Sequence, residues 1–274
     1  MLTQAQVEAY KRDGYHFPVD ILSPAEVAEY RRKLEEYEAT AGGPIQGNLR
    51  HKPHLLLTWA NELIRHPKIL DAVESIYGPD LLCWSTSFFI KEAANAGFVS
   101  WHQDSTYWGL SSPDVITVWL AFTPANEVNG AMKFLPGTQH EQVDHTDTFH
   151  EHNLLSRGQE LAVEVDESKA VLAALEPGQA SLHHVMLFHG SAPNRSADRR
   201  IGLAIRYIPT HVRQIAGARD AATLVRGVDR YNNFDAEPAP EYDLAPEAVA
   251  LHATITGQQA AILYRGTGKE EFRP

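Results

Sequence analysis

A histidine and an aspartate two residues apart, in a stretch with strand character, constrain this chain most. Residues 98–102 are aromatic and β-branched around one serine, a composition that favours a strand. Side chains at positions i and i+2 of a strand share a face, so His102 and Asp104 should project together, with Gln103 on the other face. One more imidazole would complete a facial two-histidine, one-carboxylate metal site, which leaves three positions open on an octahedral iron(II).

His189 is the best candidate for that second imidazole. It follows the apolar run 185–188 and precedes Gly190, so it is expected where a strand ends and a turn opens. Arg200 lies at the start of the next predicted strand, 201–208. If that strand returns antiparallel beside the first, Arg200 comes close to His189, where a guanidinium could bind a carboxylate through two hydrogen bonds.

Together these pieces resemble a known family. The matching residues are His102-Gln103-Asp104, Asn129-Gly130, Leu135-Pro136-Gly137-Thr138, His189-Gly190-Ser191, Asn194 and Arg200. In this order, over residues 80–210, they are similar to the phytanoyl-CoA dioxygenase family of iron(II)- and 2-oxoglutarate-dependent oxygenases. The resemblance implies a double-stranded β-helix, a cupin-like jelly roll, with helices packed on one side.

Composition narrows the class of partner. The formal net charge is −11 and no basic stripe is visible, which argues against nucleic acid. The single cysteine, Cys83, excludes an intrachain disulfide and a cysteine-based metal centre. No apolar run approaches the ~20 residues that span a membrane, and the N-terminus lacks a signal pattern. We expect a cytoplasmic enzyme of a small molecule, as a monomer or homodimer.

The first 79 residues are predicted to be mainly helical. Thr3 and Gln6 form a capping-box pattern for a helix over 3–13 that Gly14 ends, and a short strand follows at 15–19. Ser23, Pro24 and Glu26 start a second helix, 23–38. After a polar loop at 45–55, residues 56–77 form a helix that is interrupted near residues 66–67.

From residue 80 the pattern changes to strands, and the chain reads as one domain, 1–274. Strands are predicted at 81–91, 98–104, 115–122, 131–135, 179–188 and 201–208. Many short strands with turn signals indicate a sandwich or barrel, mainly β with flanking helices, over 80–210. The insertion 139–177 interrupts this core and is expected to be a lid or binding loop. The extension 211–274 receives no assignment from its sequence.

The resemblance also implies roles for individual residues. Iron(II) would be held by His102, Asp104 and His189, and the keto acid end of 2-oxoglutarate would chelate it, leaving one position for dioxygen. Arg200 would bind the distal carboxylate of 2-oxoglutarate. Its expected neighbours are Ser191, Trp119 and Gln103. Because halogenating relatives replace the carboxylate with a small residue, the presence of Asp104 favours hydroxylation over chlorination.

The substrate pocket is expected beside the metal motif. Thr106, Tyr107 and Trp108 follow it directly, and Trp84 is a further candidate. Aromatic faces attract an ammonium or methylated ammonium by about 0.5–2 kcal/mol. Residues 102–110 are similar to the subgroup that hydroxylates aminoalkylphosphonates next to phosphorus. A phosphonate also needs basic donors, which the arginines of the extension could supply.

Other interpretations remain open from sequence alone. The substrate could instead be linked to a carrier protein or to coenzyme A, or the chain could be a metal-binding jelly roll without redox chemistry. Arg200 could instead form a surface salt bridge, and Arg199 competes with it for the carboxylate-binding role, although the spacing from His189 favours Arg200. His183 and His184 are expected to be packed groups rather than ligands, and the histidines of the insertion 139–177 to be solvated.

Overall fold

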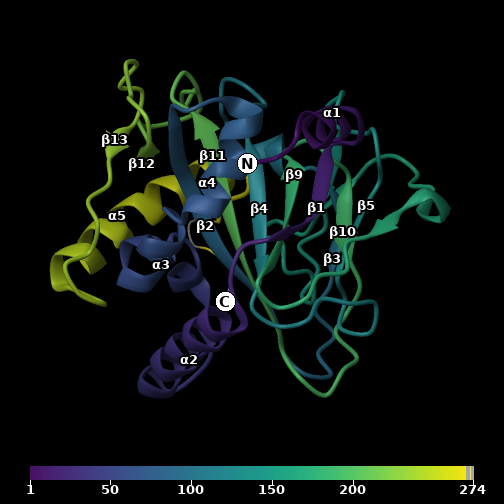
Figure 1. Ribbon diagram of the computed structural model, residues 1–274, viewed down its shortest axis with the longest axis horizontal. Coiled ribbons are helices and arrows are strands. Elements are labelled where there is room, and N and C mark those ends of the chain that lie inside the picture. The colour runs from purple at the N-terminus through teal and green to yellow at the C-terminus, as the bar shows by residue number, and fades with distance from the viewer. Residues whose placement is uncertain (270–271, 273–274) are drawn as a thin grey trace.

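Two β-sheets face each other in the computed structural model, which describes residues 1–269 and 272. Within the described residues the larger sheet has the order β1-β9-β4-β11-β2-β12-β13 and the smaller sheet the order β3-β10-β5-β8 (Figure 1). The larger sheet consists of β1 Tyr15–Asp20, β2 Leu81–Lys91, β4 Ile116–Ala121, β9 Gln179–His184, β11 Arg200–Pro209, β12 Ala221–Arg226 and β13 Asp235–Ala236. The smaller consists of β3 Val99–His102, β5 Met132–Phe134, β8 Val171–Leu172 and β10 His189–Ser191. The predicted mainly-β jelly roll is therefore confirmed.

The helices begin and end largely where the sequence predicts. They are α1 Gln4–Asp13, α2 Pro24–Ala41, α3 Thr58–Leu63, α4 Pro67–Tyr77 and α5 Pro246–Leu263, with 3-10 turns η1 Gly47–Arg50, η2 Pro53–Leu55, η3 Asp104–Tyr107 and η4 Glu167–Lys169. Both predicted capping boxes are present, at Thr3 and at Ser23. The predicted interruption at 66–67 separates α3 from α4, because Pro67 opens a new helix. None of the described helices is long and apolar enough to cross a membrane.

The two faces of strand β11, at the centre of the larger sheet, have different surroundings: one lies in the apolar core and the other faces a cavity. Its odd-numbered residues lie in the main apolar core with residues of α2, α3 and α4, which cover the outer face of the sheet (Figure 1). Those residues are Ile201, Leu203, Ile205 and Tyr207. Its even-numbered residues Arg200, Ala204 and Arg206 line a cavity between the two sheets. This alternation places two buried arginines inside the barrel.

The predicted strand 179–188 is wrong as a single element. Strand β9 ends at His184, a turn follows in which the Leu187 amide donates to the His184 carbonyl at 2.9 Å, and His189 opens β10 in the opposite sheet. Strand β10 pairs with β3 and β5, whereas β11 pairs with β2 and β4. Arg200 therefore does not reach His189 along neighbouring strands; the two face one cavity from opposite sheets.

The predicted strand 98–104 is also shorter in the structure. Strand β3 ends at His102, and Asp104 begins the 3-10 turn η3. The Asp104 amide donates to the Val185 carbonyl at 2.9 Å, which fixes this turn against the β9–β10 connection. The carboxylate thus reaches the site from a turn, and not from the i, i+2 geometry of a strand.

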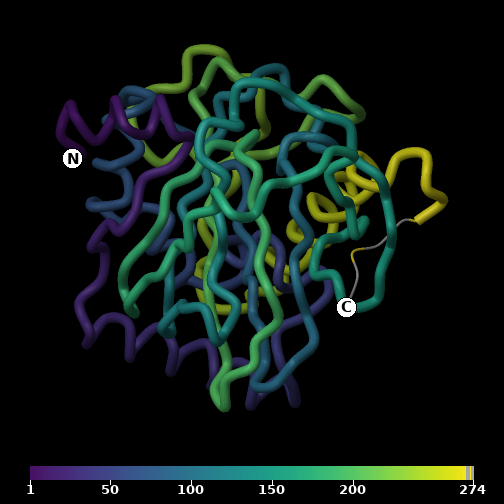
Figure 2. The backbone as a smooth tube through the Cα atoms, turned by 90° about the vertical axis from the view of Figure 1, so that its right-hand side faces the viewer, coloured from purple at the N-terminus to yellow at the C-terminus, as the bar shows by residue number. Residues whose placement is uncertain are grey.

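The insertion and the C-terminal extension meet at one end of the barrel. The insertion 139–177 forms the hairpin β6 His145–Asp147 and β7 Gln159–Leu161, while its last part supplies β8 of the smaller sheet. Figure 2 shows the chain after α5, in yellow, beside the insertion. Arg157 donates to the Leu263 carbonyl at 2.9 Å, and the Tyr264 hydroxyl donates to the Ser156 carbonyl at 3.2 Å.

Candidate active site

Three side chains with metal-binding atoms converge between the sheets. The ligand atoms of His102, Asp104 and His189 lie within 4.8 Å of one another. His102 and His189 face each other across the β3–β10 pair, with ring centroids 4.0 Å apart. Asp104 Oδ1 lies 3.3 Å from His102 Nε2. The predicted constellation is therefore assembled, although one member lies on a turn.

Backbone carbonyls orient both imidazoles. His102 Nδ1 lies 2.9 Å from the Ser100 carbonyl, and His189 Nδ1 lies 2.9 Å from the Leu187 carbonyl. A carbonyl only accepts, so each Nδ1 carries the proton and each Nε2 keeps its lone pair for a metal. Burial and the neighbouring His102 lower the pKa of His189 well below its usual value, which keeps this imidazole neutral.

Asp104 remains ionised in this setting. Burial raises the pKa of the Asp104 carboxyl, but the close contact with His102 and the positive charge of Arg206 outweigh burial, and the net pKa lies below the ordinary value. One carboxylate and two neutral imidazoles with free Nε2 atoms are the donor set that non-haem iron(II) sites use.

An inner cavity of about 420 Å³ adjoins these three side chains. Its other polar and aromatic lining includes Ser191, Trp119, Arg200, Arg206 and His183. Two of the predicted neighbours of 2-oxoglutarate, Ser191 and Trp119, are therefore brought together with Arg200.

Arg200 is a buried cation without a carboxylate partner among the described residues. Its side chain is 1% exposed, Nη1 donates to the Gly130 carbonyl at 2.6 Å, and Nε has no partner. Burial lowers the pKa of its guanidinium to about 10. Arg199, the competing candidate, instead pairs with Glu38 and Glu92. Of the two neighbouring arginines, Arg200 is therefore the one that lines the inner cavity.

A buried lysine stands beside Arg200. Lys91 faces it across the β2–β11 pair, and its Nζ donates to Ser191 Oγ at 2.7 Å and to the Ala192 carbonyl. Burial and the charge of Arg200 lower the pKa of Lys91 to about 6, so this amine is largely neutral at pH 7 without a ligand. The Arg200 guanidinium, which has no carboxylate partner among the described residues, leaves this end of the cavity suited to an anion.

Two of the predicted site residues lie elsewhere. Gln103 donates from Nε2 to the Glu141 and Met186 carbonyls, each at 2.8 Å, and its Oε1 accepts from the Val143 amide at 2.9 Å. Thr106 Oγ1 lies 3.1 Å from His145 Nδ1. Both side chains bond to the insertion and do not line the inner cavity. Their positions therefore do not support the predicted roles of Gln103 beside 2-oxoglutarate and of Thr106 in substrate binding.

The insertion contributes more than the sequence suggests. His145 is half-buried, and its Nε2 accepts from the Gln103 amide at 2.9 Å, directly beside the metal motif. The expectation that this histidine is solvated is therefore wrong. Its neutral imidazole holds the backbone between His102 and Asp104.

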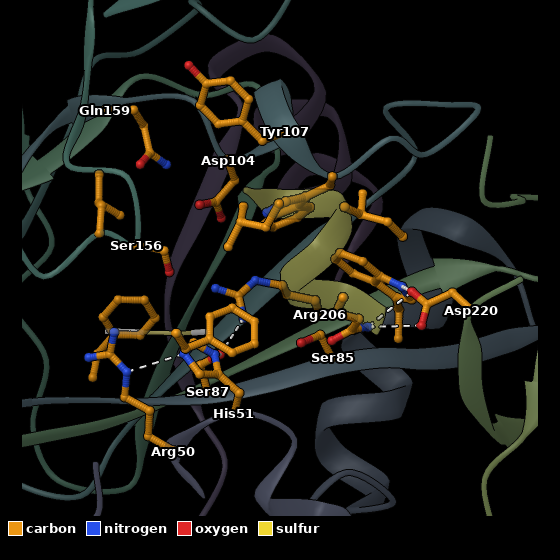
Figure 3. A pocket seen from close by; sticks show the side chains of 18 of the residues that line it. Arg50, His51, Ser85, Ser87, Asp104, Tyr107, Ser156, Gln159, Arg206 and Asp220 are labelled. Carbon is orange, nitrogen blue, oxygen red and sulfur yellow. Dashed lines mark hydrogen bonds between the residues drawn. The ribbon is translucent and has the colours of Figure 1, made fainter. Parts of the chain in front are cut away.

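An outer cavity of about 750 Å³ continues from the inner one (Figure 3). The predicted pocket residues Tyr107 and Trp108 line it, as does Trp84. Asp104 and Arg206 line both cavities, so the outer space reaches one of the three converging side chains, Asp104.

Two charged residues of the outer cavity were missed from sequence. Arg206 lies on the inward face of β11, and Asp220 precedes β12. The alternation of β11 could have identified Arg206, since it shares a face with Arg200. Three arginines of the extension are engaged elsewhere: Arg219 pairs with Asp235, Arg226 with residues of α4, and Arg230 with Asp80.

Comparisons with known proteins agree with this geometry. The profile of the family described as Phytanoyl-CoA dioxygenase (PhyH) matches residues 10–202. A curated relative, "Probable alpha-ketoglutarate-dependent hypophosphite dioxygenase" of Stutzerimonas stutzeri, is 28% identical over 250 residues, covering 84% of this chain and 83% of its own.

Two solved structures are similar over nearly the whole chain. "Non-heme monooxygenase; ThoJ apo" is 35% identical with a TM-score of 0.85, covering 95% of this chain and 98% of that one. "CytC3 with Fe(II) and alpha-ketoglutarate" is 28% identical with a TM-score of 0.65, covering 89% and 97%.

Proposed function

We propose, since this chain belongs to the phytanoyl-CoA dioxygenase family of iron(II)- and 2-oxoglutarate-dependent dioxygenases, that it hydroxylates an unactivated C–H bond of a small polar metabolite. The proposed substrate is an aminoalkylphosphonate or its N-methylated form. Membership of this family contradicts the alternative of a jelly roll without redox chemistry.

The observation that carries the proposal is the convergence of His102, Asp104 and His189 with both Nδ1 atoms tied to carbonyls. Iron(II) fits this donor set, because two neutral imidazole Nε2 atoms and one carboxylate oxygen occupy one face of an octahedron. We assign these three residues as the iron ligands. Asp104 supports hydroxylation, since it occupies the position that a halide would need.

The unpaired Arg200 guanidinium supports the binding of 2-oxoglutarate. Arg200 is assigned to its distal carboxylate, because a carboxylate would supply the missing charge and the acceptor that Nε lacks. The Ser191 hydroxyl and the edge of Trp119 line the same cavity. Lys91 Nζ donates to Ser191 Oγ and holds it in place.

When bound, iron(II) and 2-oxoglutarate would supply the oxidising chemistry, in which one oxygen atom of dioxygen would go to succinate with release of carbon dioxide and the other to the substrate C–H bond. The side chains orient the reactants: Arg200 fixes one end of 2-oxoglutarate, and the carbonyls of Ser100 and Leu187 hold the imidazole rings. The insertion and the chain around Leu263 close the outer cavity and restrict water.

The substrate class is supported by the outer cavity. Its lining combines aromatic and charged side chains, as expected for a pocket that binds a small polar ligand. The Trp84 and Trp108 rings both line this cavity, and the face of an indole attracts a methylated ammonium. The relative named for hypophosphite supports a phosphorus oxyanion.

The proposal is tested by product analysis. The protein is incubated aerobically with iron(II), 2-oxoglutarate and a panel of aminoalkylphosphonates, amino acids and coenzyme A thioesters. The expected result is succinate and an equal amount of a singly hydroxylated aminophosphonate. Asp104→Ala should abolish both products, whereas Asp114→Ala, which removes a surface carboxylate paired with His211, should not. Hydroxylation at the wild-type rate by Asp104→Ala would refute the assignment.

A further inference from the structure

Arg206 is the second buried guanidinium on the inward face of β11. Its side chain is 7% exposed; Nη1 donates to Ser87 Oγ at 3.1 Å, and Nε has no partner. No carboxylate among the described residues forms an ion pair with it, although Asp104 lines the same cavities. Because Asp104 is assigned to the metal, an anion from outside the chain is the natural partner of Arg206.

Asp220 is a buried carboxylate of the same outer cavity. It is 1% exposed and accepts only from neutral groups: Trp84 Nε1 at 2.6 Å, Gln259 Nε2 at 3.0 and 3.2 Å, and its neighbour's amide, Ala221, at 2.8 Å. No cation of the described residues pairs with it. These three neutral donors satisfy the carboxylate oxygens, but none of them supplies a counterion.

Aromatic rings connect the two charged residues. The Arg206 guanidinium lies 5.0 Å from the Trp108 ring centroid, and Trp108 lies 4.9 Å from Trp84, which donates to Asp220. Figure 3 shows the Arg206 guanidinium below Asp104, and it shows Asp220 at the right-hand side of the pocket. The cavity is therefore polarised, with a cation near the metal site, an anion away from it, and indole faces between.

We propose that the outer cavity binds a zwitterion, with its anionic group on Arg206 and its ammonium group on Asp220, beside the Trp84 indole. This inference rests on the proposed function and names the two residues that select the substrate. Arg206 lines both cavities, whereas Asp220 lines only the outer one. The anionic end therefore lies nearer to Asp104, and the C–H bond beside the anionic group is the one presented for hydroxylation.

The alternative is a purely structural role, in which Asp220 only holds Trp84 and α5 against β12 through its hydrogen bonds. Asp220→Asn separates the two roles, because the amide oxygen still accepts from the Trp84 indole while the charge is lost. The matched control is Asp235→Asn, which removes the charge of an exposed carboxylate paired with Arg219 on β13. Both variants are assayed as the full chain with iron(II) and 2-oxoglutarate.

The probes are two pairs of equal shape. N,N,N-trimethyl-2-aminoethylphosphonate is paired with 3,3-dimethylbutylphosphonate, and trimethylglycine with 3,3-dimethylbutyrate; in each pair carbon replaces the charged nitrogen. Binding is measured without oxygen, by calorimetry and by the shift of the iron(II)–2-oxoglutarate visible band. Wild-type protein should prefer an ammonium probe over its isostere by about 30-fold, equivalent to about 2 kcal/mol.

Asp220→Asn should erase that preference while the affinity for the neutral isostere stays the same, and Asp235→Asn should retain it. Arg206→Gln should weaken both members of a pair. Equal loss of both members in Asp220→Asn would show a purely structural role and overturn the inference. So would a wild-type protein that forms the iron(II)–2-oxoglutarate band and shows no preference in either pair. Failure to form the band at all would instead refute the proposed function.

Discussion

Arg200→Gln tests the assignment of the 2-oxoglutarate site. Burial lowers the pKa of this guanidinium from 12.5 to about 10, and each pKa unit corresponds to 1.36 kcal/mol, so the charged form is penalised by about 3 kcal/mol in the pocket without a ligand. A carboxylate that pairs with Arg200 should restore at least this amount. The variant should therefore lose about 3 kcal/mol of binding free energy, or about 150-fold in the dissociation constant of 2-oxoglutarate.

The assay is anaerobic calorimetry of 2-oxoglutarate binding in the presence of iron(II). The matched control is Arg199→Gln, one residue earlier, where the guanidinium pairs with Glu38 and Glu92 and is not part of the cavity. The control should bind 2-oxoglutarate like the wild type. An Arg200→Gln variant with an affinity within threefold of the wild type would refute the reasoning.

A second readout separates binding from a structural role. Because the charge of Arg200 has no counterion among the described residues, its removal should not lower the free energy of unfolding of the protein without ligands. Thermal unfolding of Arg200→Gln with and without 2-oxoglutarate measures this. A lowered midpoint without ligand, combined with unchanged ligand stabilisation, would identify Arg200 as a structural residue.

Three further predictions follow from buried contacts. Glu237→Gln should cost about 3–5 kcal/mol of unfolding free energy, because it leaves Lys52 uncompensated in the core, whereas Asp235→Asn on the surface should cost less than about 1 kcal/mol in the same denaturation assay. Burial raises the pKa of Glu237, but Lys52 and a histidine outweigh burial and bring the pKa to about 2. The stabilisation by ionised Glu237 is therefore complete above the ordinary pKa of 4.5, and an acid titration of stability should show its loss as the pH falls from 4.5 to 2. A wild-type curve that is flat over this range and parallel to that of Glu237→Gln would contradict this. Gly202→Ala should weaken 2-oxoglutarate binding, because a Cβ at this position would lie 1.9 Å from Trp119 Cζ2. The control Gly257→Ala has open space around it in α5 and should be neutral or stabilise the fold by about 0.5–1 kcal/mol. Equal affinities of the two variants for 2-oxoglutarate would refute the argument from close approach.

Local signals in the sequence predicted most of the element boundaries. Capping residues fix helix starts within a few positions, so Thr3 and Ser23 identified α1 and α2 correctly. Strand β2 matches its predicted range of 81–91, because its apolar and polar residues are bounded by turn signals. The three converging residues were also predicted, because the choice of two histidines and an aspartate rests on the side-chain types that bind a metal and not on exact strand geometry.

Long-range pairing could not be predicted in the same way. The apolar run before His189 gives no sign that it is a turn between two sheets, because buried turns and buried strands have the same composition. Asp220 was missed because its donors come from three separate elements, β2, β12 and α5. The role of a buried charged residue depends on neighbours that are distant in sequence. Arg206 was missed for that reason, although the strand alternation that places it on the same face as Arg200 was visible in the sequence.

The measurement that tests the central claim most directly is an anaerobic titration with iron(II) and 2-oxoglutarate, followed by visible absorption. Chelation of the keto acid to bound iron(II) produces a weak charge-transfer band. The account predicts this band in the wild-type protein and its loss in His189→Ala. An intact band in His189→Ala, or no band in a wild-type protein that demonstrably binds iron(II), would contradict the assignment of His102, Asp104 and His189 as the iron site.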